Sequence, residues 1–134
     1  MFYEISVSTP QKIALVDVTE KIEETVKESK VRNGICFIYV PHTTCGILIN
    51  ENYDPSVIRD ILNAYERIVP QNLPYAHLEG NSPAHIKSTI VGVNTFVFIR
   101  EGKLKLGTWQ GIFLAEFDGP RYRKLWIDII EDKD

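Results

Sequence analysis

The chain has 134 residues, of which 44% are apolar and 25% are charged, and its formal net charge is -3. This length and composition predict a single globular domain over residues 1–134. The negative charge argues against a general nucleic-acid-binding protein, and without a membrane-spanning apolar stretch or an apolar leader we expect a cytoplasmic protein.

Strands and a helix are expected in the first third of the chain. Residues 2–8 alternate in the manner of a β-strand. Asp17 and Glu20 have the spacing of a capping box and open an amphipathic helix. Continuous apolar character predicts a buried strand over 35–40 and a shorter strand over 47–49.

Two further helices and a strand-rich C-terminal part follow. Asp54-Pro55 and Ser82-Pro83 each combine a cap with a proline and open helices that Pro70 and Gly92 end. Branched and aromatic residues predict strands over 93–100, 104–117 and 122–130. The pattern predicts an α+β fold: a mainly antiparallel, two-layer β-sandwich-like core with two longer helices and one short helix.

All three histidines lie in two short polar segments, residues 41–46 and residues 75–85. Imidazole is the commonest metal ligand and the side chain whose unperturbed pKa lies nearest neutrality. We therefore predict that His42, His77 and His85 act together, either on a divalent metal (zinc or magnesium) or as acid–base groups. The plainer interpretation is three unrelated histidines, of which one caps a helix, one packs and one is solvated.

The second polar segment also supplies an acid and a helix start. If residues 75–79 are extended, His77 and Glu79 project on the same face because strand side chains alternate. Ser82 begins the short helix, whose free N–H groups and positive dipole end favour an anion. In the plainer interpretation Ser82 is only a helix cap and Glu79 is a solvated loop residue.

Other side chains are less decisive. Cys45 follows the first histidine segment and is expected to pack rather than react. Trp109 and Gln110 interrupt an apolar strand between two glycines, so Trp109 is equally consistent with a stacking surface and with ordinary core. A local excess of cations fits a small anionic ligand better than a polyanion; its members are Lys103, Lys105, Arg121, Arg123 and Lys124.

Four motifs together resemble the YjbQ-like family, and the likeness runs over nearly the whole chain. They are His42-Thr43-Thr44, Asn50-Glu51-Asn52 before Asp54-Pro55, Glu79-Gly80-Asn81 before Pro83-Ala84-His85-Ile86-Lys87, and the run from Leu106 to Gly111. The resemblance implies a compact α+β protein built around a β-sandwich and assembled as a homotrimer. It also implies an enzyme, a secondary thiamine-phosphate synthase, that joins a hydroxymethylpyrimidine diphosphate to a thiazole phosphate.

On this reading, the three histidines and Glu79 form the catalytic site, and a small phosphorylated heteroaromatic molecule is the substrate. Phosphate is held by Ser82, Lys87 and Arg121, while Trp109, paired with Gln110, stacks on a ring. Two alternatives stay open: a metal-dependent hydrolase of a small phosphorylated or anionic metabolite, and a non-enzymatic protein that binds such a metabolite. Metal content and product analysis with the two thiamine precursors separate the three hypotheses.

Overall fold

Strands with one buried and one outward face form the larger of two sheets. In the computed structural model, which describes residues 1–133, this sheet is antiparallel and has the order β1 (Phe2–Ser8), β8 (Tyr122–Glu131), β3 (Gly34–Tyr39), β5 (Asn94–Arg100), β6 (Lys103–Leu104). Burial alternates along β8, where Arg123, Leu125, Ile127 and Ile129 are buried and the residues between them face outward.

The smaller sheet has three antiparallel strands in the order β2 (Ala14–Asp17), β7 (Gln110–Glu116), β4 (Cys45–Glu51). Its inner face packs on the larger sheet, and residues of both sheets share one apolar core. After its first residue the central strand β7 is buried throughout. Continuous burial explains why this strand reads as an unbroken apolar run rather than as an alternating one.

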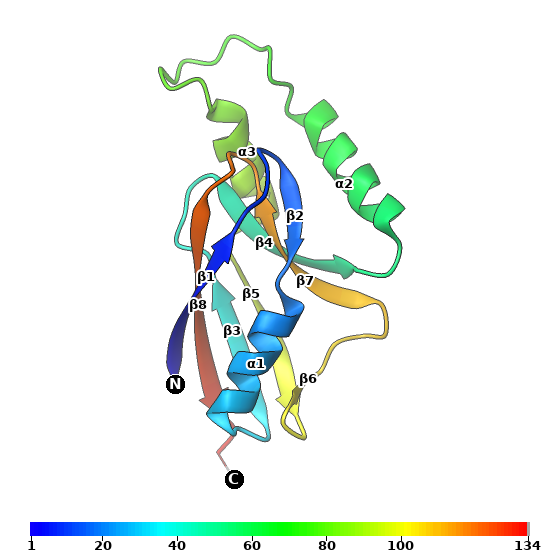
Figure 1. Cartoon of the computed structure of the whole chain (residues 1–134). Coiled ribbons are helices and arrows are strands. Elements are labelled where there is room, and N and C mark those ends of the chain that lie inside the picture. The colour runs from blue at the N-terminus through cyan, green and yellow to red at the C-terminus, as the bar shows by residue number, and fades with distance from the viewer. Residues whose placement is uncertain (134) are drawn as a thin grey trace.

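Three helices surround the sheets (Figure 1). Helix α1 (Thr19–Ser29) directs Ile22 and Val26 into the core between the sheets. Helix α3 (Ser82–Val91) packs on β4, and α2 (Pro55–Ile68) lies beside the smaller sheet with none of its residues fully buried. Among residues 1–133, no helix is long and apolar enough to cross a membrane.

The predicted α+β class with a β-sandwich-like core is confirmed, and several element boundaries are corrected. The short strand β2 was not predicted. The expected strand over 104–117 is two strands, because the chain leaves the larger sheet after β6 and enters the smaller sheet at β7. Asn81, rather than Ser82, precedes the first turn of α3.

The expected capping box at the start of α1 is also corrected. The carboxylate of Asp17 accepts from the backbone N–H and the hydroxyl of Thr19, at 2.9 and 2.6 Å. These bonds fix the entry into the helix one residue later than the spacing to Glu20 predicted.

Gly46 allows α3 to approach β4 closely. A Cβ atom at this position would lie 2.5 Å from the carbonyl oxygen of Gly92 and 2.9 Å from a side-chain carbon of Val91. We expect Gly46→Ala to lower the free energy of unfolding by about 1–3 kcal/mol, the usual cost of overpacking. Urea denaturation measures the change.

Gly107→Ala is the matched control for that substitution, because its Cβ would meet only the flexible side chain of Gln110. Equal stability of the two variants would show that the contact between β4 and α3 is loose.

Candidate functional site

The two polar segments of the sequence meet in a cleft of about 480 Å³. It lies where the loop after β3, the loop before α3 and the turn between β7 and β8 come together. We call it the histidine cleft; its lining residues are Pro41, His42, Thr43, Thr44, His77, Glu79, Asn81, His85, Asp118, Arg121 and Arg123.

His42 is hydrogen-bonded to strand β8 of the larger sheet. The backbone N–H of Lys124, in β8, donates to Nε2 of His42 at 2.9 Å. Partial burial and the positive charge of Arg123 lower the pKa of His42. The ring is therefore neutral near pH 7 and carries its proton on Nδ1.

The rings of His77 and His85 lie next to each other in the lining of the cleft. Their ring centroids lie 5.3 Å apart in an edge-on arrangement. Nε2 of His77 also lies 4.0 Å from a carboxylate oxygen of Glu79. The loop before α3 and the first turn of α3 thus bring two imidazoles and an acid to one place, where a proton can be gained or lost.

A buried ion pair forms the floor of the cleft. Glu116, in β7, is fully buried and accepts from Nε of Arg123, in β8, at 2.8 Å. Its other oxygen accepts from Nη2 of Arg123 and from the backbone N–H of Asp118. Thr44 Oγ1 also accepts from Nη2 at 2.9 Å, which connects the pair to the segment that carries His42.

A second, more exposed ion pair forms one wall. Arg121 donates to the carboxylate of Asp118 at 3.0 Å, and Nδ2 of Asn81 donates to the same oxygen at 3.0 Å. Because Nδ2 is engaged there, Oδ1 of Asn81 must act as an acceptor. It is the one buried side-chain polar atom without a partner among residues 1–133.

The structure separates several predicted site residues from the cleft. Lys87 is fully buried and its ammonium contacts the carboxylate of Glu66. Gln110 pairs with Glu51, at the opposite end of β7 from Glu116. The six residue-to-residue steps from Gln110 to Glu116 span about 20 Å, so Gln110 and the neighbouring Trp109 do not share a ligand with the cleft of the same chain.

The predicted anion cradle at the start of α3 is largely occupied. The N–H groups of Ala84 and His85 both donate to the carbonyl of Asn81, at 3.0 and 3.4 Å, and Pro83 has no N–H. This leaves the backbone N–H of Ser82 as the free donor of the first turn among the described residues, and Ser82 does not line the cleft.

Cys45 packs in the core, as expected, where burial raises the pKa of its thiol to about 12. At neutral pH such a thiol is protonated and unreactive.

The three histidines line one cleft without forming a three-ligand cluster. Within residues 1–133, no three His, Cys, Asp or Glu side chains are grouped closely enough to hold a metal ion. Nε2 of His42 is also occupied by the N–H of Lys124.

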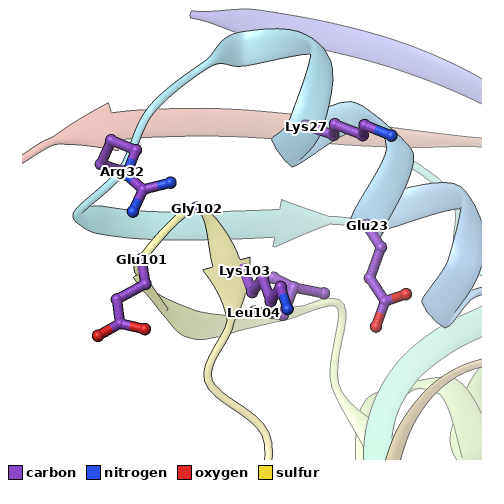
Figure 2. A pocket seen from close by; sticks show the side chains of 7 residues that line it. All are labelled: Glu23, Lys27, Arg32, Glu101, Gly102, Lys103 and Leu104. Atoms are coloured by element: carbon purple, nitrogen blue, oxygen red, sulfur yellow. The ribbon is translucent and has the colours of Figure 1, made fainter.

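A larger hollow of about 580 Å³ lies at the other end of the larger sheet (Figure 2). Arg32 and the turn at Glu101 and Gly102 form one side, and Glu23 and Lys27 of α1 contribute to the lining. No side-chain polar atom of this hollow is both buried and unpartnered. In the histidine cleft, by contrast, buried hydrogen bonds hold Arg123 in place. The histidine cleft is for this reason the better candidate for a ligand-binding site.

Sequence reasoning missed the buried half of the site. Neither Glu116 nor Asp118 was predicted as a site residue, and Arg123 was predicted only as a member of a general cluster of cations. The cluster in fact divides, because Lys103 and Lys105 lie in and beside β6, far along the sheet from Arg123. A glutamate inside the apolar run of β7 is the signal that could have found Glu116.

The chain matches the profile of the family described as UPF0047 protein YjbQ-like over residues 3–132. A UPF0047 protein of Methanocaldococcus jannaschii is 53% identical, with 99% of this chain and 96% of the relative covered. A crystal structure of a YjbQ/UPF0047 protein from Clostridium acetobutylicum is 48% identical, covers 96% of this chain and 99% of its own, and gives a TM-score of 0.93. A YbjQ-like protein of unknown function from Sulfolobus solfataricus is 38% identical, covers 98% and 97%, and also gives 0.93.

Proposed function

The chain belongs to the UPF0047 YjbQ-like family, and we propose that its histidine cleft binds a small phosphorylated metabolite and performs acid–base chemistry on it. The observation that carries this proposal is the presence of three histidines and two arginines on one cleft. A volume of about 480 Å³ suits a small molecule.

The reaction that we propose first is the coupling made by thiamine-phosphate synthase. A ring nitrogen of the thiazole phosphate forms a bond to the methylene carbon of the pyrimidine diphosphate. The bond between that carbon and the diphosphate oxygen breaks, and its electron pair leaves with pyrophosphate. Arg121 and Arg123 supply positive charge for the leaving group, and His77 or His85 supplies a proton to it.

Ring stacking by Trp109 fits this proposal only if the tryptophan comes from another chain. We propose a homotrimer, as the resemblance implies. The outer face of the larger sheet exposes a set of aromatic side chains: Phe2, Phe37, Tyr39, Phe96, Phe98 and Trp126. On the smaller sheet, α2 leaves its apolar stripe half-buried. Two different apolar surfaces are what a closed ring of identical subunits requires.

Strand β8 contributes Trp126 to that surface, while its neighbours Leu125 and Ile127 are fully buried in the core. Light scattering is expected to give the mass of three chains, and a monomer at high concentration would contradict the assembly.

A metal-dependent hydrolase is the second candidate. The edge-on pair of His77 and His85 beside Glu79 favours it, since two imidazoles and a carboxylate suit a zinc ion that activates water. Elemental analysis of the purified protein for zinc and magnesium, followed by removal with a chelator, tests this candidate. If the protein hydrolyses a phosphate ester and the chelator abolishes that hydrolysis, the hydrolase is favoured over the transferase.

Product analysis separates the candidate functions. The protein is incubated with both thiamine precursors, with and without added Mg²⁺, and thiamine phosphate and pyrophosphate are measured. We expect the two products in equal amounts. Binding of the precursors without any product would favour the non-enzymatic metabolite-binding protein, and no binding would contradict the proposal.

A further inference from the structure

Arg123 is a buried arginine, and one nitrogen of its guanidinium makes no hydrogen bond within residues 1–133. Its side chain is 5% exposed, and its hydrogen bonds within residues 1–133 use Nε and Nη2 only. Nη1 makes no hydrogen bond there, and it is not sealed from solvent. Since Arg123 lines the histidine cleft, Nη1 is the part of the guanidinium that reaches its surface.

Glu116 and Thr44 hold this guanidinium in one orientation. The two oxygens of Glu116 take Nε and Nη2 side by side, a bidentate arrangement that fixes the plane of the group. Glu116 is itself held by the hydroxyl of Thr9 at 2.7 Å and by the N–H of Asp118 at 3.0 Å. Thr44 closes the other side of Nη2. The direction of the Nη1 donor is therefore set before any ligand binds.

Arg121 lacks this support. About half of its side chain is exposed, and its contacts are with the carbonyl and carboxylate of the nearby Asp118. The side chain of an exposed arginine can adapt its conformation to a bound ligand, but it does not fix the position of that ligand. The two arginines of the cleft thus differ in rigidity.

We propose that Arg123 is the fixed anchor of the site, and that its Nη1 binds a phosphoryl oxygen of the ligand while Glu116 and Thr44 keep it aimed. This inference rests on the proposed function, because it names the group that recognises the phosphate. Lysine cannot replace Arg123 here, since an ammonium that contacts Glu116 has no second nitrogen to present to the cleft.

The test compares pyrophosphate binding by calorimetry in the unaltered protein and in Arg123→Lys. The substitution keeps the positive charge beside Glu116, so a change in affinity reports the lost Nη1 donor rather than the field. We expect Kd to rise at least tenfold. Arg100→Lys is the matched control, because Arg100 lies on β5 outside the cleft, and its Kd is expected to stay within twofold.

A further arm keeps the outcomes distinct. Succinate replaces pyrophosphate in a parallel titration: if the unaltered protein binds succinate and not pyrophosphate, the phosphate function and the phosphoryl anchor are both overturned. If neither anion binds, both proposals are overturned. If pyrophosphate binds equally well to Arg123→Lys, only the anchor is overturned.

A spectroscopic measurement covers the case in which Arg123→Lys does not fold. In the unaltered protein, pyrophosphate is expected to shift the NMR signal of the Arg123 side-chain Nε–H and to leave that of Arg100 in place. An unchanged Arg123 signal at saturating pyrophosphate would overturn the anchor.

Discussion

Replacing Glu116 with glutamine is expected to lower the free energy of unfolding by about 3–5 kcal/mol, the cost of leaving a buried charge without its partner. Glu116 is fully buried, and both of its oxygens accept from Arg123. A neutral amide supplies no compensating charge, and its NH₂ group would face donors. Urea denaturation at pH 7 measures the loss.

The exposed Glu23 provides the control, since it lies on α1 and forms no ion pair within the described residues. We expect Glu23→Gln to change the free energy of unfolding by less than about 0.5 kcal/mol. If Glu116→Gln is as stable as Glu23→Gln, the buried pair does not hold β7 and β8 together.

The same pair gives the stability a defined pH dependence. Burial tends to raise the pKa of Glu116, but hydrogen bonds from Arg123, Asp118 and Thr9 outweigh it and hold the pKa below its usual value. Between the two pKa values the folded state binds fewer protons than the unfolded state. The contribution of Glu116 is therefore complete above the unfolded pKa and is lost as the pH falls through the folded pKa. We expect the stability gap between the unaltered protein and Glu116→Gln to narrow from pH 7 to pH 3.

Replacing His85 with alanine is expected to reduce turnover at least about 100-fold, the lower range for a lost acid–base group. The free energy of unfolding should change by less than about 0.5 kcal/mol. His85 is only partly buried, and its ring contacts His77 rather than the core. Steady-state kinetics and thermal melting are measured on the same preparation.

Ile86→Ala serves as the control for changes in helix α3, because Ile86 is exposed and does not line the cleft. Full turnover in a stable His85→Ala protein would remove His85 from the chemistry. An unfolded variant would assign His85 a structural role, the plainer interpretation of the sequence.

The sequence predicts more of the fold than of the candidate site. Period-two alternation and apolar runs gave most of the strands, and proline with a cap gave both later helices. β2 was missed because four residues are too few for a pattern, and its pairing with β7 comes from a strand about one hundred positions away. The chain's change of sheet between β6 and β7 likewise depends on tertiary packing.

Local sequence patterns indicated the histidines of the cleft but not the buried ion pair of Glu116 and Arg123 beneath them. Lys87 seemed suited to phosphate because it is near His85 in sequence. Two positions along a helix, however, turn the side chain by about 200°, away from the face that His85 presents. Glu116 and Arg123 are seven positions apart on neighbouring strands of different sheets, and only the packing of the two sheets makes them partners.

NMR of the histidine rings during a pyrophosphate titration tests the central claim most directly. We predict that the ring signals of His42, His77 and His85 all shift with one binding curve, while the side-chain Nε–H signal of Arg100, on β5 outside the cleft, does not move. Histidine signals that stay unchanged while residues around the second hollow shift, such as Arg32 and Lys103, would show that the histidine cleft is not the ligand site.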